Sequence, residues 1–173
     1  MTTPVIVFRD AFVREPDGLF EHLVTSVIWD ERMRARKTAS FGVSYDYSQM
    51  SYPEAPMPPA LDTIADDIHA ALGFRPNNCL LNFYPDGEAS MGFHSDSSEE
   101  LAPGSGVSIV SLGATRAMMF RLKADRSVEH VLPLTSGSLL HMPNAMQDDW
   151  LHAIPRAPGT GPRISATFRQ IIK

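Results

Sequence analysis

The chain has 173 residues, of which 43% are hydrophobic and 20% charged, and its formal net charge is −5. These values fit one compact globular domain over residues 1–173 and exclude a low-complexity or strongly basic chain. No apolar stretch approaches the ~18 residues of a membrane span, the amino terminus lacks a basic segment before an apolar run, and Cys79 is the single cysteine. We therefore expect a monomeric cytoplasmic protein without a membrane partner.

The first half of the chain predicts a short strand and two helices. Val5–Phe8 is expected to be the strand. The first helix has apolar residues at helical spacing and Asp17 as its N-cap; these residues are Leu19, Phe20, Leu23, Val24 and Val27. The second helix follows Pro58 and Pro59 and ends near Gly73, with one apolar stripe of Leu61, Ile64, Ala65, Ile68 and Leu72. Between the helices, 37–59 is predicted to be mostly irregular, with a strand at Phe41–Tyr47.

After residue 77 the sequence predicts strands separated by turns. Short runs of β-formers alternate with Gly- and Pro-containing breaks. The predicted strands are Cys79–Tyr84, Val107–Leu112, Ala117–Leu122, Val128–Leu134, Ser138–His141, Trp150–Ile154 and Ile164–Ile172. Strands at this spacing favour a sandwich or barrel, here with a helical layer from the amino-terminal residues.

We assign no catalytic or binding role to the two basic runs of the sequence or to its cysteine. The first run contains Arg32, Arg34, Arg36 and Lys37, and the second contains Arg116, Arg121, Lys123 and Arg126. Both are interpreted as solvated surfaces. Cys79 precedes two leucines and is expected to be a buried structural thiol.

The tripeptide His94-Ser95-Asp96 is the first candidate site. In a strand, alternate side chains share a face, so His94 and Asp96 could point together into a barrel. With His152 as a third ligand, two imidazoles and one carboxylate would bind iron(II) and leave open coordination positions. A His-x-Asp pair alone is more often a hydrogen-bonded pair than a metal site, and His141 competes with His152 for the third position.

The segment Arg163–Arg169 is the second candidate site. Alternation places Arg163, Ser165, Thr167 and Arg169 on one face, and the apolar residues between them toward the core. Buried arginines need anionic partners, which a dicarboxylate would supply; the alternative is an edge strand with solvated arginines. Because the two arginines are roughly 20 Å apart along a strand, we expect Arg163 to bind the distal carboxylate.

Asn82 and Tyr84 also share one strand face, just before a Pro-Asp-Gly turn. Both can donate hydrogen bonds to a carboxylate. Without other information they would be the polar face of an ordinary strand.

Together these motifs resemble the AlkB family of iron(II)/2-oxoglutarate dioxygenases. The similarity covers most of 78–170, from Asn82 through HSD, ELAPGS, SLGATR, GSLLHM and WLHAIP to PRISATFR. Three of these motifs, ELAPGS, SLGATR and PRISATFR, especially resemble the DNA-repair branch. It implies a double-stranded β-helix (jelly-roll) catalytic core over 78–173, with helical support and a substrate lid over 1–77.

The resemblance also implies residue roles. Iron(II) would bind to His94, Asp96 and His152, and 2-oxoglutarate to Asn82, Tyr84, Arg163, Ser165 and Arg169. A lid over the modified base would contain Phe41, Tyr45 and Tyr47, since a flipped base needs stacking surfaces. The implied reaction uses O₂ to remove N-alkyl groups from DNA or RNA, such as 1-methyladenine or 3-methylcytosine, and releases formaldehyde, succinate and CO₂.

Two departures from the family pattern concern the cosubstrate site and the base preference. Ser165 stands where the family motif has asparagine, and Ser97 and Ser98 stand where acidic residues often follow the iron motif. No hairpin for opening a duplex is evident, so the substrate is expected to be single-stranded. The negative net charge favours an alternative, an oxygenase of the same fold that acts on a protein side chain or small molecule. A non-enzymatic binding module is the third possibility.

Overall fold

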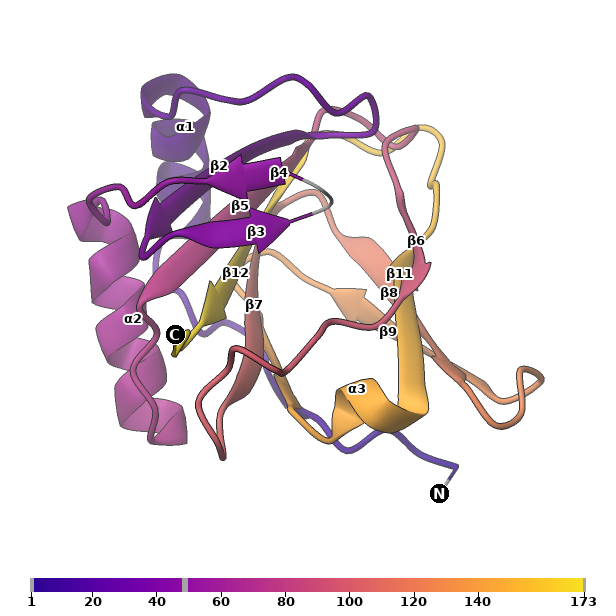
Figure 1. The fold of residues 1–173 in the computed structure, drawn as a ribbon. Coiled ribbons are helices and arrows are strands. Elements are labelled where there is room, and N and C mark those ends of the chain that lie inside the picture. Colours follow the sequence, from indigo (N-terminus) through magenta and orange to yellow (C-terminus); the bar gives the residue numbers. More distant parts are fainter. Residues whose placement is uncertain (1, 48–49, 173) are drawn as a thin grey trace.

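A computed structural model describes residues 2–47 and 50–172 and shows two β-sheets facing each other, with helices on one side (Figure 1). The major sheet has six strands in the order β1 (Val7–Arg9), β10 (Leu139–Pro143), β7 (Gly106–Gly113), β12 (Arg163–Arg169), β5 (Asn78–Tyr84) and β2 (Lys37–Gly42). The minor sheet has four, in the order β6 (Met91–His94), β11 (Trp150–Ile154), β8 (Arg116–Leu122) and β9 (Glu129–Leu134). This arrangement is the predicted jelly-roll core.

Strand β12 shows how the sequence pattern places a site between the sheets. All seven of its residues are buried, because it lies between β7 and β5 and is covered on both faces. Its apolar residues Ile164, Ala166 and Phe168 belong to the core beneath the helices. Its polar residues line a pocket between the sheets. The predicted alternation is therefore confirmed.

The helices α1 (Pro16–Ser26) and α2 (Pro59–Leu72) cover the outer face of the major sheet (Figure 1). Four residues of the predicted α2 stripe are buried: Leu61, Ile64, Ala65 and Ile68. Gly73 ends the helix in the left-handed conformation, as predicted. The prediction for Asp17 is wrong. It lies in the first turn of α1, where its carboxylate complements the helix dipole, and the N-cap is Glu15.

The segment between the helices differs most from its prediction. It contains three strands, β2, β3 (Tyr45–Tyr47) and β4 (Met50–Tyr52), rather than a mostly irregular loop. The expected strand Phe41–Tyr47 is broken at Gly42, whose φ is +86° and whose Cβ would lie 2.0 Å from the Asn77 carbonyl oxygen. Since β3 pairs with β4, a short hairpin follows this break.

Further details concern the ends of the elements and the cysteine. Strands β1 and β2 place part of the amino-terminal segment within the major sheet. A short helix, α3 (Met146–Asp149), was not predicted. Cys79 is fully buried in the core beneath the helices, and burial raises the pKa of its thiol, so the structural interpretation is confirmed. None of the described helices is long and apolar enough to cross a membrane.

Candidate functional site

The three predicted metal ligands converge at one end of the pocket between the sheets. His94 is the last residue of β6, and it is the register partner of His152 on β11. Asp96 lies two residues beyond β6. Its carboxylate oxygens are 3.6 Å from His94 Nε2 and 3.7 Å from His152 Nε2. One ligand atom from each residue lies within 4.8 Å of the others. We call this cluster the metal end of the pocket.

The surroundings of both imidazoles suit metal binding. His94 Nδ1 lies 2.8 Å from the Gly92 carbonyl oxygen. A carbonyl can only accept a hydrogen bond, so Nδ1 carries a proton, and Nε2, which faces Asp96, is the ring atom placed to bind a metal. Burial lowers the pKa of His152 to about 4, which leaves this imidazole neutral at neutral pH. The His152 ring therefore need not lose a proton to bind a cation.

His141, the competing third ligand, lies elsewhere. It belongs to β10 of the major sheet, and its Nδ1 is hydrogen-bonded to Ser108 Oγ at 2.8 Å. Its ring also packs against Phe74, beneath the helices. The structure therefore brings His152, and not His141, to His94 and Asp96.

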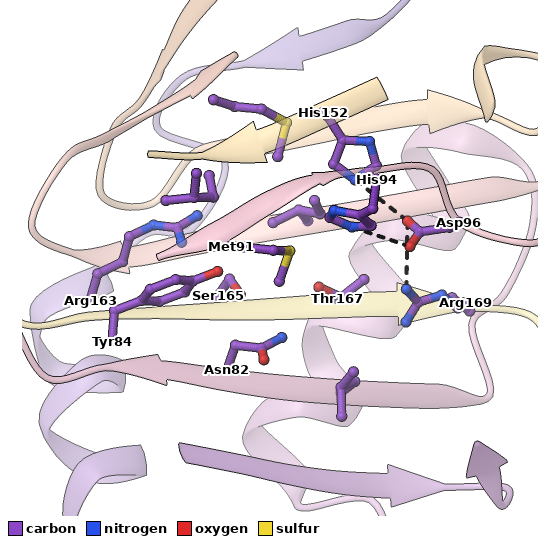
Figure 2. Close-up of a pocket in the computed structure, with 14 residues that line it drawn as sticks. Asn82, Tyr84, Met91, His94, Asp96, His152, Arg163, Ser165, Thr167 and Arg169 are labelled. Carbon is purple, nitrogen blue, oxygen red and sulfur yellow. Dashed lines mark ion pairs between the residues drawn. The ribbon is translucent and has the colours of Figure 1, made fainter. Parts of the chain in front are cut away.

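Arg163 lies at the other end of the same pocket (Figure 2). The side chain is 1% exposed, and its Nη2 donates to Ser111 Oγ at 2.9 Å. Its Nε and Nη1 are buried without a hydrogen-bond partner. Burial lowers the pKa of this guanidinium, because the charged form loses its hydration, while the nearby Tyr84 side chain acts in the opposite direction. A ligand carboxylate reaching this end would satisfy the two unpaired N–H groups.

Of the other predicted cosubstrate residues, Asn82 and Ser165 lie between these two ends, and Tyr84 lies beside Arg163 (Figure 2). Asn82 and Tyr84 on β5 are the register partners of Ser165 and Arg163 on β12, and all four line the pocket. Arg169 lies at the metal end, with Nη2 at 3.8 Å from Asp96 Oδ2 and with Nε and Nη1 unpaired. The two arginines of β12 thus occupy opposite ends of the pocket, as their sequence spacing indicated.

Two arginines that we interpreted as solvated are buried beside the pocket. Arg36 Nε donates to Asn82 Oδ1 at 2.9 Å, and its Nη1 donates to the Ser90 carbonyl at 3.1 Å. Arg116 Nη2 donates to the carbonyls of Ala89 and Pro155, each at 2.7 Å. The period-2 pattern Arg116, Met118, Phe120 would have placed Arg116 inward. Nothing in the local sequence around Arg36 indicates that it is buried.

The predicted lid residues are placed differently from one another. The Arg169 guanidinium lies over the Tyr45 ring, with Cζ 4.7 Å from the ring centroid, so Tyr45 is near the metal end. Phe41 packs against the core beneath the helices, which corrects its expected place in the lid. On β2, Thr38 and Ser40 pair with Asn82 and Leu80 of β5, which line the pocket. Phe41 is the next residue along β2, so its side chain points to the opposite face of the sheet. The side chain of Tyr47 lies outside the described residues.

Comparison with known proteins agrees with this geometry. Residues 21–169 match the family model of the 2OG-Fe(II) oxygenase superfamily. The chain belongs to this superfamily. Over 148 residues it is 36% identical to the human DNA oxidative demethylase ALKBH2, covering 79% of this chain and 57% of the relative. Over 179 residues it is 32% identical to the human alpha-ketoglutarate-dependent dioxygenase alkB homolog 3, covering 92% of this chain and 63% of the relative.

These relatives place this superfamily member in the AlkB family, although it spans only about six-tenths of their length. The solved structure of OsALKBH1 superposes with a TM-score of 0.70 at 20% identity, covering 97% of this chain and 99% of that one. That likeness supports the jelly-roll fold. The residues fit the groups after which the superfamily is named, since two imidazoles and a carboxylate suit iron(II) and unpaired arginine N–H groups suit a dicarboxylate.

Proposed function

We propose that this protein is an iron(II)- and 2-oxoglutarate-dependent dioxygenase that removes N-alkyl groups from nucleic-acid bases. One observation carries the proposal. A single pocket has a His-Asp-His cluster at one end and a buried, incompletely hydrogen-bonded arginine at the other. A small dicarboxylate that also chelates a metal is the ligand that such a pocket suits.

In this proposal His94, Asp96 and His152 hold iron(II), and Arg163 pairs with the distal carboxylate of 2-oxoglutarate. Tyr84 and Asn82 offer hydrogen bonds along the cosubstrate, and Ser165 lines the same wall. When bound, iron and 2-oxoglutarate supply the O₂-dependent oxidation of an N-alkyl group, with succinate, CO₂ and formaldehyde as products. The buried walls of the pocket exclude water from this reaction.

Arg169 has a separate role in holding the metal end. Its guanidinium lies between the Asp96 carboxylate and the Tyr45 ring. It therefore orients an iron ligand and supports an aromatic face beside the pocket. A base that enters next to Tyr45 could stack on the ring face opposite the Arg169 guanidinium, an interaction worth about 1–3 kcal/mol. This stacking surface favours a nucleobase as the group that carries the N-alkyl substituent.

We further propose that the preferred substrate is single-stranded DNA or RNA. A duplex has the denser phosphate charge, and this chain has a net charge of −5. The β3–β4 hairpin near the site is short, with three residues in each strand. The same net charge also suits the alternative, an oxygenase acting on a protein side chain or a small molecule.

The test is incubation with iron(II), 2-oxoglutarate and oligonucleotides containing 1-methyladenine or 3-methylcytosine, as single- and double-stranded DNA and as RNA. We expect formaldehyde release and loss of the methyl mass, both abolished in Asp96→Ala. Succinate formation without any loss of methyl mass would support the alternative. A protein that consumes no 2-oxoglutarate under any of these conditions would contradict the proposal.

A further inference from the structure

Asp96 is the metal ligand that the β-sheets do not fix. His94 and His152 are register partners in the β6–β11 pair, so the ladder sets the separation of their rings. Asp96 lies beyond the end of β6, outside that ladder. Its carboxylate is within 4 Å of His94, His152 and Arg169. Something other than strand pairing must hold its backbone.

The Gln147 side chain makes that contact. Gln147 Oε1 accepts a hydrogen bond from the Asp96 backbone N–H at 2.8 Å, across 51 positions of the chain. Gln147 is 5% exposed, so water does not readily replace this bond. It belongs to α3, which leads directly into β11 and His152.

The short helix α3 is itself firmly attached. Lys123 Nζ donates to the Gln147 carbonyl at 2.7 Å, and the Lys123 backbone N–H donates to the Asp149 carbonyl at 2.8 Å. Met146 is buried in the core between the sheets. The Gln147 side-chain amide therefore extends from a backbone that is held by Lys123 and by the buried Met146 side chain.

We infer that Gln147 is a positioning residue for the metal site, which aligns Asp96 by accepting a hydrogen bond from its backbone N–H. Without the acceptor, the Asp96 backbone loses this hydrogen bond, and the contact of its carboxylate with Arg169 Nη2 at 3.8 Å does not by itself fix the position of the backbone. Groups that orient metal ligands typically contribute 10–100-fold to metal affinity. The inference rests on the proposed function, because it requires that the cluster bind a divalent cation.

The experiment measures Mn²⁺ affinity of the full chain by the electron paramagnetic resonance signal of the free ion. Q147M has a side chain of similar length without the acceptor, and Q147E keeps an oxygen that accepts the same hydrogen bond. The matched control is D148N, at an exposed neighbouring position of α3. We expect Mn²⁺ binding about 10–100-fold weaker in Q147M, and affinity at least equal to wild type in Q147E and D148N.

A second readout reports the hydrogen bond itself. Amide hydrogen exchange at Asp96 should be faster in metal-free Q147M, and unchanged in Q147E and D148N. If Q147M does not fold, the test relies on Q147E, in which the Asp96 amide must stay protected from hydrogen exchange. Loss of that protection with Mn²⁺ affinity retained would overturn the inference.

The outcomes separate this inference from the proposed function. If the wild type binds Mn²⁺ and D96A does not, the metal site stands. Equal Mn²⁺ affinity in Q147M and wild type would then refute only the role of Gln147, as would equally weak binding in Q147M and Q147E. If the wild type binds no Mn²⁺, the proposed function itself fails.

Discussion

At the scale of single residues, the site is defined by polar groups whose burial is only partly compensated. Buried N–H groups of arginine are normally hydrogen-bonded, because the charge loses its hydration on burial. Arg163 and Arg169 each leave two nitrogens unpaired, at opposite ends of one pocket. Burying these N–H groups without hydrogen-bond partners is costly, and an anionic ligand would offset the cost.

Replacing Arg163 with methionine should weaken 2-oxoglutarate binding strongly. The change removes the buried cation opposite the distal carboxylate, and loss of one member of a buried charge pair costs about 2–5 kcal/mol. Arg163→Lys should lose less, since it keeps the charge without the forked geometry. The KM for 2-oxoglutarate, followed by succinate formation, measures both effects. An unchanged KM in Arg163→Met would place the distal carboxylate elsewhere.

Replacing Arg36 with methionine should have a smaller effect on the same KM. Arg36 does not line the pocket but holds the Asn82 carboxamide through its Oδ1. A hydrogen bond from a charged donor contributes about 1.5–3 kcal/mol. Only part of that energy affects the binding of 2-oxoglutarate, because Arg36 acts through Asn82. The comparison with Arg34→Met, at an exposed position of the same basic run, separates this effect from a loss of surface charge. Equal KM values in the two variants would contradict a link between Arg36 and Asn82.

At the scale of elements, the β2–β3 segment depends on the backbone conformation of one glycine. Gly42 ends β2 with a φ of +86°, and the chain then turns into the β3–β4 hairpin beside the metal end. A β-carbon there would collide with the backbone of the loop that precedes β5. The turn therefore positions Tyr45 at the site while leaving Phe41 on the helix side.

Gly42→Ala should accordingly destabilise the fold more than Gly73→Ala. Both glycines have left-handed φ values, +86° and +85°, so both substitutions carry the conformational cost of about 1–2 kcal/mol. Only at Gly42 does the added β-carbon meet backbone atoms, at 2.0 Å, whereas at Gly73 it meets nothing within 4 Å. Urea unfolding of the two variants measures the free energies. Equal losses would show that the Gly42 turn relaxes readily.

At the scale of the whole molecule, the two sheets bring together residues that are far apart in the chain. The minor sheet supplies His94 and His152, and the major sheet supplies the cosubstrate wall from β5 and β12. The helices cover the other face of the major sheet (Figure 1). The site therefore depends on the packing of the sandwich, and so on its global stability.

Global stability should decrease as the pH falls below about 6.5, in part because of His141. Burial lowers the pKa of His141 from its ordinary value of 6.5. Between the lowered pKa and 6.5 the unfolded chain binds a proton that the folded chain does not, so acid favours unfolding. His141→Asn should reduce the slope of unfolding free energy against pH in this range.

Urea unfolding of metal-free protein between about pH 5 and pH 7.5 measures that slope. His22→Asn, on the exposed face of α1, is the matched control and should leave the slope unchanged. A slope that is the same in His141→Asn and wild type would show that other groups account for the acid sensitivity.

The sequence alone determined those features that follow from local period and chemistry. The apolar stripe of α2, the alternation along β12 and the His-x-Asp spacing each depend on neighbours a few residues apart, so they could be recognised before folding. The family motifs added His152, which no local pattern connects to His94.

The tertiary structure decided the features that depend on which distant segments pack against each strand or helix. Arg36 and Arg116 are as charged as any surface arginine, yet in the interior they donate hydrogen bonds to carbonyls and to a side-chain amide from other segments. Phe41 faces the helices because β2 pairs in register with β5, and Gln147 meets Asp96 because α3 leads into β11, the strand that pairs with β6. Three of the hydrogen bonds among these contacts join positions 46, 27 and 51 residues apart, and local periodicity holds no information about them.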